Sequence, residues 1–423
     1  MRLPLCSLLG AMLCVSAQAA ESGPKDRTLL IYDTLAKPFS AMNEVEPIAL
    51  VLTGFKTEVV KKEAAQITPA DIENSNRIIL AGVSGIPKLD PASQRLIEKT
   101  SKPFLGIGRA ANLAGDSEIK SKPLNKADVS YRGAKWEVRL HPFHPEPPKG
   151  AQILAEAISE SGKWALAWRA GNRFGFGTLP GNQALSMILS DILSDFFGNA
   201  EKGRSGLFFI IQNYHPGSDP TALRRLADYM AFNELPFIVT TQLRDVPSDV
   251  TQLMPRETYL DSLRYAQSRG GKIFLRGEIG AQDVENYTLD GVYPVGGENP
   301  SIAMPAAFAD PVPFTVFLGN RIYQSMPGSE YVPFRSHSLL FLPNGGILLP
   351  PNILGGLDGD ALESVKKSIR ELKPLRNSVA GVIVPAWLPF QKMRDVVDAA
   401  RSCGMPMIPA QTLSSNPSAS EHK

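Results

Sequence analysis

The chain has 423 residues, of which 44 are Lys or Arg and 42 are Asp or Glu, and 43% are hydrophobic. This near balance of charge offers no electrostatic basis for binding nucleic acid, so nucleic acid is not an expected partner. The length is too great for one small domain and suits two or three.

The first 20 residues have the layout of a secretory signal peptide. One Arg2 precedes an apolar run, which ends at Ala17-Gln18-Ala19. No later segment reaches the roughly 18 uninterrupted apolar residues of a membrane span. We therefore expect a periplasmic or secreted protein without a membrane span after signal removal. Cys403 is the one cysteine beyond the signal, so we expect no internal disulfide and a buried thiol at a helix end.

Residues 21–125 read as a doubly wound parallel α/β domain. Buried strands are predicted at 28–32, 77–83 and 103–108, with a helix at 91–100. The turn Gly106-Ile107-Gly108 resembles the strand-to-helix turn of class I glutamine amidotransferase-like domains. Those domains carry a nucleophilic cysteine where Gly108 stands, so the resemblance implies a flavodoxin-like scaffold with no amidase chemistry.

Within residues 126–204, the runs 131–140 and 163–179 alternate and are rich in aromatic side chains, and Gly171-Asn172 falls between two alternating runs. This pattern predicts a β-hairpin in a small antiparallel segment. An amphipathic helix is expected at 181–198, followed by a polar linker.

Residues 205–413 repeat a strand-then-helix pattern, which predicts a (β/α) barrel. Strands are expected at 207–211, 236–242, 272–278, 381–387 and 406–410, with helices after the first, second and fourth. Proline and glycine cluster between 291 and 356, so that region should be rich in loops. The tail, 414–423, should be disordered.

The segments 207–243, 262–278, 333–357 and 382–408 together resemble the polysaccharide-deacetylase (NodB-homology) superfamily. The resemblance implies a metal held by one Asp and two His, with a second Asp as the base. Here the acid pair falls on Gln212 and Asn213, and the first histidine falls on Arg276. Amides supply neither a base nor anionic ligands, so we expect no catalytic residues, no bound metal and no cofactor.

Other residues leave alternatives open. A substitute metal site from His215, His337 and either Asp219 or Glu278 is conceivable, but His215 could equally hydrogen-bond its own loop. Arg276 and Glu278 could form an ion pair or could bind a ligand hydroxyl or carboxylate. Five aromatic residues could stack on sugar rings or belong to the core: Tyr214, Tyr287, Tyr293, Tyr323 and Trp387.

These observations predict an exported, catalytically degenerate deacetylase-like protein. Its expected partners are a polysaccharide or oligosaccharide and the proteins of polysaccharide synthesis or export. The predicted ligand-binding residues are Gln212, Asn213, His215, Arg276, Glu278, His337 and Trp387. Two alternatives stand beside this hypothesis: an active carbohydrate esterase or glycan hydrolase with relocated catalytic residues, and a scaffold protein that binds no glycan.

Overall fold

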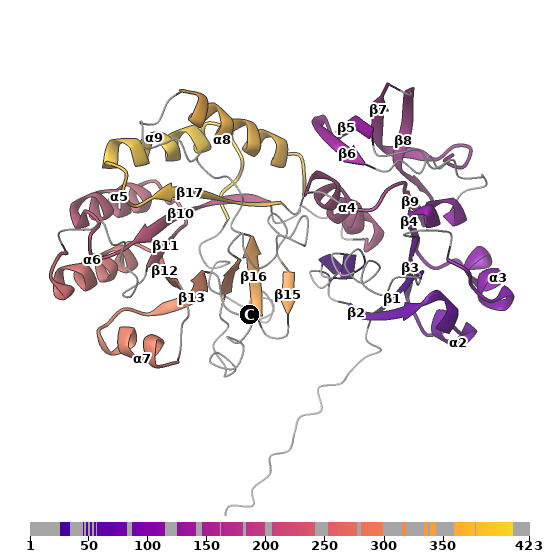
Figure 1. Ribbon diagram of the computed structural model, residues 1–423, viewed down its shortest axis with the longest axis horizontal. Helices are drawn as coiled ribbons and strands as arrows, with labels where there is room; N and C mark the ends of the chain where they lie inside the picture. Colours follow the sequence, from indigo (N-terminus) through magenta and orange to yellow (C-terminus); the bar gives the residue numbers. More distant parts are fainter. Residues whose placement is uncertain are drawn as a thin grey trace, which may run out of the picture.

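The computed structural model describes residues 26–33, 45, 48–49, 51–52, 55, 57–82, 87–114, 125–140, 146–160, 162–180, 183–198, 205–241, 253–276, 281–298, 315–318, 334–336, 339–343, 359–376 and 378–408. The predicted signal peptide, Glu278, His337, the predicted tail and most of 291–356 lie outside these residues. The described part forms two sheets with their helices (Figure 1). None of its helices is long and apolar enough to cross a membrane.

The first sheet has nine strands in the order β2-β1-β3-β4-β9-β8-β7-β5-β6. Its parallel part contains β1 (Arg27–Tyr32), β2 (Glu58–Glu63), β3 (Arg77–Gly82), β4 (Phe104–Gly108) and β9 (Arg173–Phe176). Its antiparallel part contains β5 (Asn125–Tyr131), β6 (Ala134–Leu140), β7 (Gln152–Ser159) and β8 (Gly162–Ala170). β1, β3 and β4 are buried almost throughout, as their continuous apolar runs predict.

Short helices connect these strands: η1 (Ala64–Gln66), α2 (Pro69–Glu73), α3 (Pro91–Lys99) and η2 (Arg109–Ala114). Local sequence explains where α3 begins. The Asp90 carboxylate accepts hydrogen bonds from the backbone N–H groups of Ala92 (2.9 Å) and Ser93 (3.1 Å), and Pro91 occupies the first helical position.

The predicted hairpin at Gly171-Asn172 is present between β8 and β9. The antiparallel strands extend the first sheet, however, instead of forming a small sheet of their own. The reason is that β9 pairs in parallel with β4, and the Phe104 N–H donates to the Asn172 carbonyl at 3.0 Å. This pairing covers the otherwise open edge of β4.

Helix α4 (Gln183–Phe196) confirms the predicted helix, but its polar side is buried and does not face solvent. From Ala184 to Phe197 every side chain is buried except that of Asp195. The helix packs on the first sheet through an edge-to-face contact between Phe174 and Phe196, with ring centroids 5.7 Å apart. It lies between the two sheets in Figure 1, which explains why it has no broad solvent-facing side.

The second sheet has eight strands in the order β15-β16-β14-β13-β12-β11-β10-β17. They are β10 (Gly206–Tyr214), β11 (Phe237–Thr241), β12 (Lys272–Arg276), β13 (Pro294–Glu298), β14 (Thr315–Leu318), β15 (Phe334–Ser336), β16 (Leu339–Pro343) and β17 (Val379–Pro385). All pairs are parallel except β15 with β16. β16 also contacts β17, although the described hydrogen-bonded pairs leave the sheet open there.

The helices of the second sheet are α5 (Pro220–Phe232), α6 (Arg256–Ser268), α7 (Ala281–Leu289), α8 (Gly359–Leu372) and α9 (Phe390–Arg401). Of the strand predicted at 406–410, the described residues form an isolated bridge between Met407 and Leu207. Cys403 is buried just beyond α9, as predicted.

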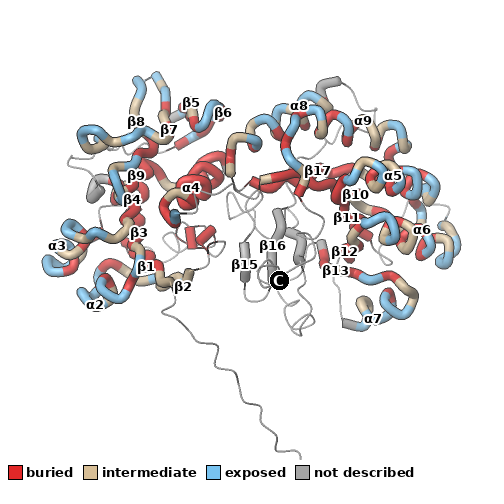
Figure 2. The backbone as a smooth tube through the Cα atoms, turned by 180° about the vertical axis from the view of Figure 1, so that it is seen from behind, coloured by how far each residue is buried: buried red, intermediate tan, exposed pale blue. Residues whose placement is uncertain are grey.

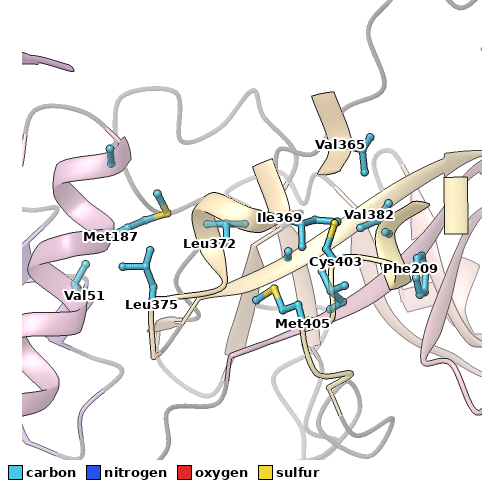
Figure 3. Close-up of a cluster of buried hydrophobic side chains, with 14 of the residues drawn as sticks. Val51, Met187, Phe209, Val365, Ile369, Leu372, Leu375, Val382, Cys403 and Met405 are labelled. Atoms are coloured by element: carbon cyan, nitrogen blue, oxygen red, sulfur yellow. The ribbon is translucent and has the colours of Figure 1, made fainter. Parts of the chain in front are cut away.

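One apolar core joins the two sheets. Figure 3 shows Met187 of α4 and Val51 in the same cluster as Leu372 and Leu375. Leu372 is the last residue of α8, and Leu375 lies between α8 and β17. Figure 2 shows that α4 and β17 are both largely buried. We refer to the first sheet with α4 as the N-terminal unit, and to the second sheet with α5–α9 as the C-terminal unit.

Candidate functional site

The carboxyl ends of β12, β11, β10 and β17 lie side by side, because these four strands are parallel neighbours. Arg276 ends β12, Gln212 and Asn213 lie near the end of β10, and Trp387 follows β17. The predicted site residues within the described ranges therefore share one edge of the sheet. In parallel α/β proteins this is the edge at which ligands bind.

A backbone irregularity lies at the two amides, Gln212 and Asn213. The pairing of β10 with β11 shifts register between Ile211 and Tyr214, which is the signature of a β-bulge. Asn213 takes a positive φ of 62°, a conformation that asparagine adopts more readily than most residues. Its N–H donates to Thr240 Oγ1 at 3.1 Å, and its buried side-chain oxygen has no hydrogen-bond partner among the described residues.

A chain of buried hydroxyl groups supports this bulge from beneath. Thr241 Oγ1 donates to the Tyr214 carbonyl at 2.8 Å and contacts the Tyr259 hydroxyl, which lies 3.3 Å from the Tyr287 hydroxyl. The Tyr214 and Tyr259 rings stack with centroids 5.6 Å apart. Burial raises the pKa of all three tyrosines, so they stay neutral at physiological pH.

His215 orders the loop that follows β10. Its Nδ1 accepts a hydrogen bond from the Gly217 N–H at 3.0 Å, and its own N–H donates to Ser218 Oγ at 3.1 Å. Asp219 caps α5 by accepting from the Thr221 N–H at 2.8 Å. The loop-ordering interpretation of His215 is thus confirmed, and two residues of the alternative metal set already have structural partners.

The rest of that alternative metal set lies outside the described residues, since neither His337 nor Glu278 is among them. Within the described ranges, no group of three or more His, Cys, Asp and Glu side chains is arranged to hold a metal ion. Arg276 is half-buried and stands in register with Glu298 of β13. Its predicted pairing with Glu278 stays a prediction.

The aromatic residues separate into two groups once the structure is known. Tyr214 and Tyr287 are buried, so neither offers a face to a ligand. Tyr293 is exposed but precedes β13, which places it at the opposite edge of the sheet. Trp387, by contrast, is 51% exposed in the turn directly after β17. Tyr323 lies outside the described residues.

Leu253 also lies at the carboxyl edge, although the sequence-based prediction did not include it. It is 58% exposed and precedes α6, where the neighbouring Met254 N–H donates to the Pro216 carbonyl at 2.8 Å. This bond holds Leu253 beside the His215 loop. The one available signal was its place in the loop after β11, since such loops line the carboxyl edge.

The N-terminal unit contains the predicted glycine at its strand-to-helix turn. Gly108 ends β4 with a φ of 63°, and η2 follows immediately. A Cβ atom at this position would lie 2.5 Å from the Gly82 carbonyl oxygen. The turn therefore joins a strand to a helix, as predicted, and it has no room for a nucleophilic side chain at position 108.

Comparisons with known proteins identify no family. No family model and no curated protein matches the chain. The solved structures similar to this chain include three with low TM-scores. A glutamine amidotransferase from Thermotoga maritima has 16% identity, covers 41% of this chain and 84% of its own, and gives a TM-score of 0.27. A ThuA-like protein from Parabacteroides merdae has 13% identity, covers 36% of this chain and 78% of its own, and gives a TM-score of 0.26.

The third of these structures is phospho-2-dehydro-3-deoxyheptonate aldolase from Thermotoga maritima. It has 13% identity, covers 48% of this chain and 72% of its own, and gives a TM-score of 0.26. TM-scores this low establish no common fold for the whole chain, and no function is transferred from these proteins. The resemblance to polysaccharide deacetylases accordingly rests on the sequence motifs alone.

Proposed function

We propose that the chain is an exported, catalytically degenerate polysaccharide-deacetylase-like protein that binds a surface polysaccharide or its assembly machinery. In this proposal the C-terminal unit is a (β/α) barrel, and glycan binds at the carboxyl edge of its strands. The contact between β16 and β17 supports closure, because these strands lie toward opposite ends of the parallel sheet.

The observation that carries the proposal is the chemistry of this edge. Gln212 and Asn213 supply amide donors and acceptors, and Arg276 supplies a guanidinium. Trp387 adds an exposed aromatic face of the kind that packs against the apolar side of a sugar ring. This set can bind hydroxyl and acetamido groups, but it lacks the acid pair that the deacetylase reaction requires at 212 and 213.

Calorimetric titration with N-acetylated and de-N-acetylated hexosamine oligosaccharides tests the proposal. Replacing Arg276 with Ala should weaken binding by about 1.5–3 kcal/mol, as expected for a hydrogen bond to a charged group. Replacing Trp387 with Ala should weaken it by roughly 1–2 kcal/mol through lost apolar contact. Tyr293→Ala is the matched control, because it removes an exposed aromatic side chain at the opposite edge.

Acetate release measured in parallel separates the alternatives. Release that depends on Gln212 or His215 would favour an active esterase, and absence of binding to any of these glycans would favour a scaffold protein. Introducing Asp at both 212 and 213 should not create deacetylation, because the two histidine ligands would still be missing.

A further inference from the structure

Two carboxylates of α4 face the C-terminal unit. Asp191 and Asp195 are four residues apart and therefore lie on the same face of the helix. The Asp191 side chain is 1% exposed and that of Asp195 is 18% exposed. A buried and a partly buried carboxylate this close together are stable only when cations and hydrogen-bond donors compensate them.

Arg376 supplies most of this compensation from the C-terminal unit, where it lies between α8 and β17. Its Nε and backbone N–H both donate to Asp191 Oδ1, at 3.0 and 2.7 Å. Its Nη1 and Nη2 form a bidentate pair with Asp195 at 2.6 and 2.7 Å. Burial opposes the charge of Arg376, but the bonds to Asp195 and Asp191 outweigh burial and raise its pKa.

The turn between β5 and β6 contributes a second cation. Arg132 Nε lies 2.8 Å from Asp191 Oδ2, and the neighbouring Tyr131 hydroxyl donates to the same carboxylate. Burial raises the pKa of Tyr131, so its hydroxyl keeps its proton. Two carboxylates thus face two guanidinium groups, and the cluster is balanced in charge.

We propose that this cluster of Tyr131, Arg132, Asp191, Asp195 and Arg376 is an interdomain lock that holds the two units in one orientation. Three of its segments meet at Asp191, and Arg376 is the one member from the C-terminal unit. The apolar contacts around Met187 and Leu375 attract the units without fixing their direction, whereas bidentate hydrogen bonds are directional.

The lock is independent of the proposed glycan site. Arg376 precedes β17 and so lies at the amino edge of the second sheet, while the site occupies the carboxyl edge. Removing Arg376 leaves the buried Asp191 and the partly buried Asp195 with less positive charge beside them. Because separation of the units would return both carboxylates to water, we expect the units to separate when Arg376 is removed.

Small-angle X-ray scattering and differential scanning calorimetry of the full chain test the lock. Arg376→Ala should increase the radius of gyration and split one unfolding transition into two. The triple variant Asp191→Asn, Asp195→Asn and Arg376→Met removes the directional bonds without leaving a buried carboxylate, and it should also increase the radius of gyration. Arg256→Ala is the control, since Arg256 forms an exposed ion pair with Asp290 within the C-terminal unit.

Compact Arg376→Ala protein with a single transition would overturn the proposal. If that variant does not fold, Asp195→Asn decides through trypsin cleavage at Lys202 and Arg204, between α4 and β10. At least tenfold faster cleavage than in the wild type supports the lock, and an unchanged cleavage rate refutes it.

Discussion

Substitution of Gly108 by alanine tests why the amidotransferase-like turn contains no nucleophile. Gly108 has a φ of 63°, which costs an L-residue about 1–2 kcal/mol. The new Cβ would also lie 2.5 Å from the backbone oxygen of Gly82. Because backbone cannot swing away as a flexible side chain does, β3 and β4 must separate at their ends, at a cost of about 1–3 kcal/mol.

Gly171 is a matched control for this change. Its φ of 62° is nearly the same, but a Cβ there would meet no atom within 4 Å. Gly171→Ala should therefore cost only the conformational part, and Gly108→Ala should cost roughly 2–5 kcal/mol in total. The difference between the two variants measures the steric contact alone.

Urea denaturation followed by tryptophan fluorescence is a suitable assay. Three of the four tryptophans lie on β6 and β8 of the same unit: Trp136, Trp164 and Trp168. Equal destabilisation by the two alanine variants, within about 0.5 kcal/mol, would refute the steric argument. A cysteine carries the same Cβ, so the reasoning extends directly to the missing nucleophile.

Three further predictions concern other parts of the chain. A hydrogen bond from Lys62 lowers the pKa of Asp71 to about 2, so Asp71 stabilises the fold above pH 4 and loses this effect as the pH falls toward 2. In Asp71→Asn, the free energy of unfolding measured with urea should therefore fall less between pH 4 and pH 2 than in the wild type. An equal fall in both proteins would contradict the assignment. Buried Cys403 should react with a thiol reagent only after unfolding, and rapid stoichiometric labelling of native protein would show otherwise. Elemental analysis after dialysis should find no stoichiometric zinc, nickel or cobalt, because amides occupy the acid positions at 212 and 213; one tightly bound ion per chain would disprove this.

Local sequence was sufficient for many of the individual elements. Continuous apolar runs identified β1, β3, β4, β10, β11 and β17, because a strand buried on both faces needs apolar side chains at every position. Asp90-Pro91 and Asp219-Pro220 stand at two helix starts, where both the cap and the proline act within one turn. The hairpin at Gly171-Asn172 depended on equally local geometry.

The candidate site was predictable only in part. That Gln212, Asn213, Arg276 and Trp387 share an edge follows from the strand-then-helix order, because parallel strands all end on the same side. The burial of Tyr214 and Tyr287 does not follow from this order. It is decided by contacts with Tyr259, whose ring stacks on that of Tyr214 and whose hydroxyl lies 3.3 Å from that of Tyr287.

Tertiary contacts alone decided how the pieces join. The sequence of 126–204 specifies antiparallel hairpins, but their addition to the first sheet depends on the open edge of β4, which lies elsewhere in the chain. The polar residues of α4 predicted a solvent-facing side, yet Asp191 is buried because Arg376, 185 positions away, supplies the opposite charge. The periodicity of a sequence shows which side chains of a helix are polar. A polar side chain can be buried only beside a partner, and that partner is brought into place only when distant segments pack together.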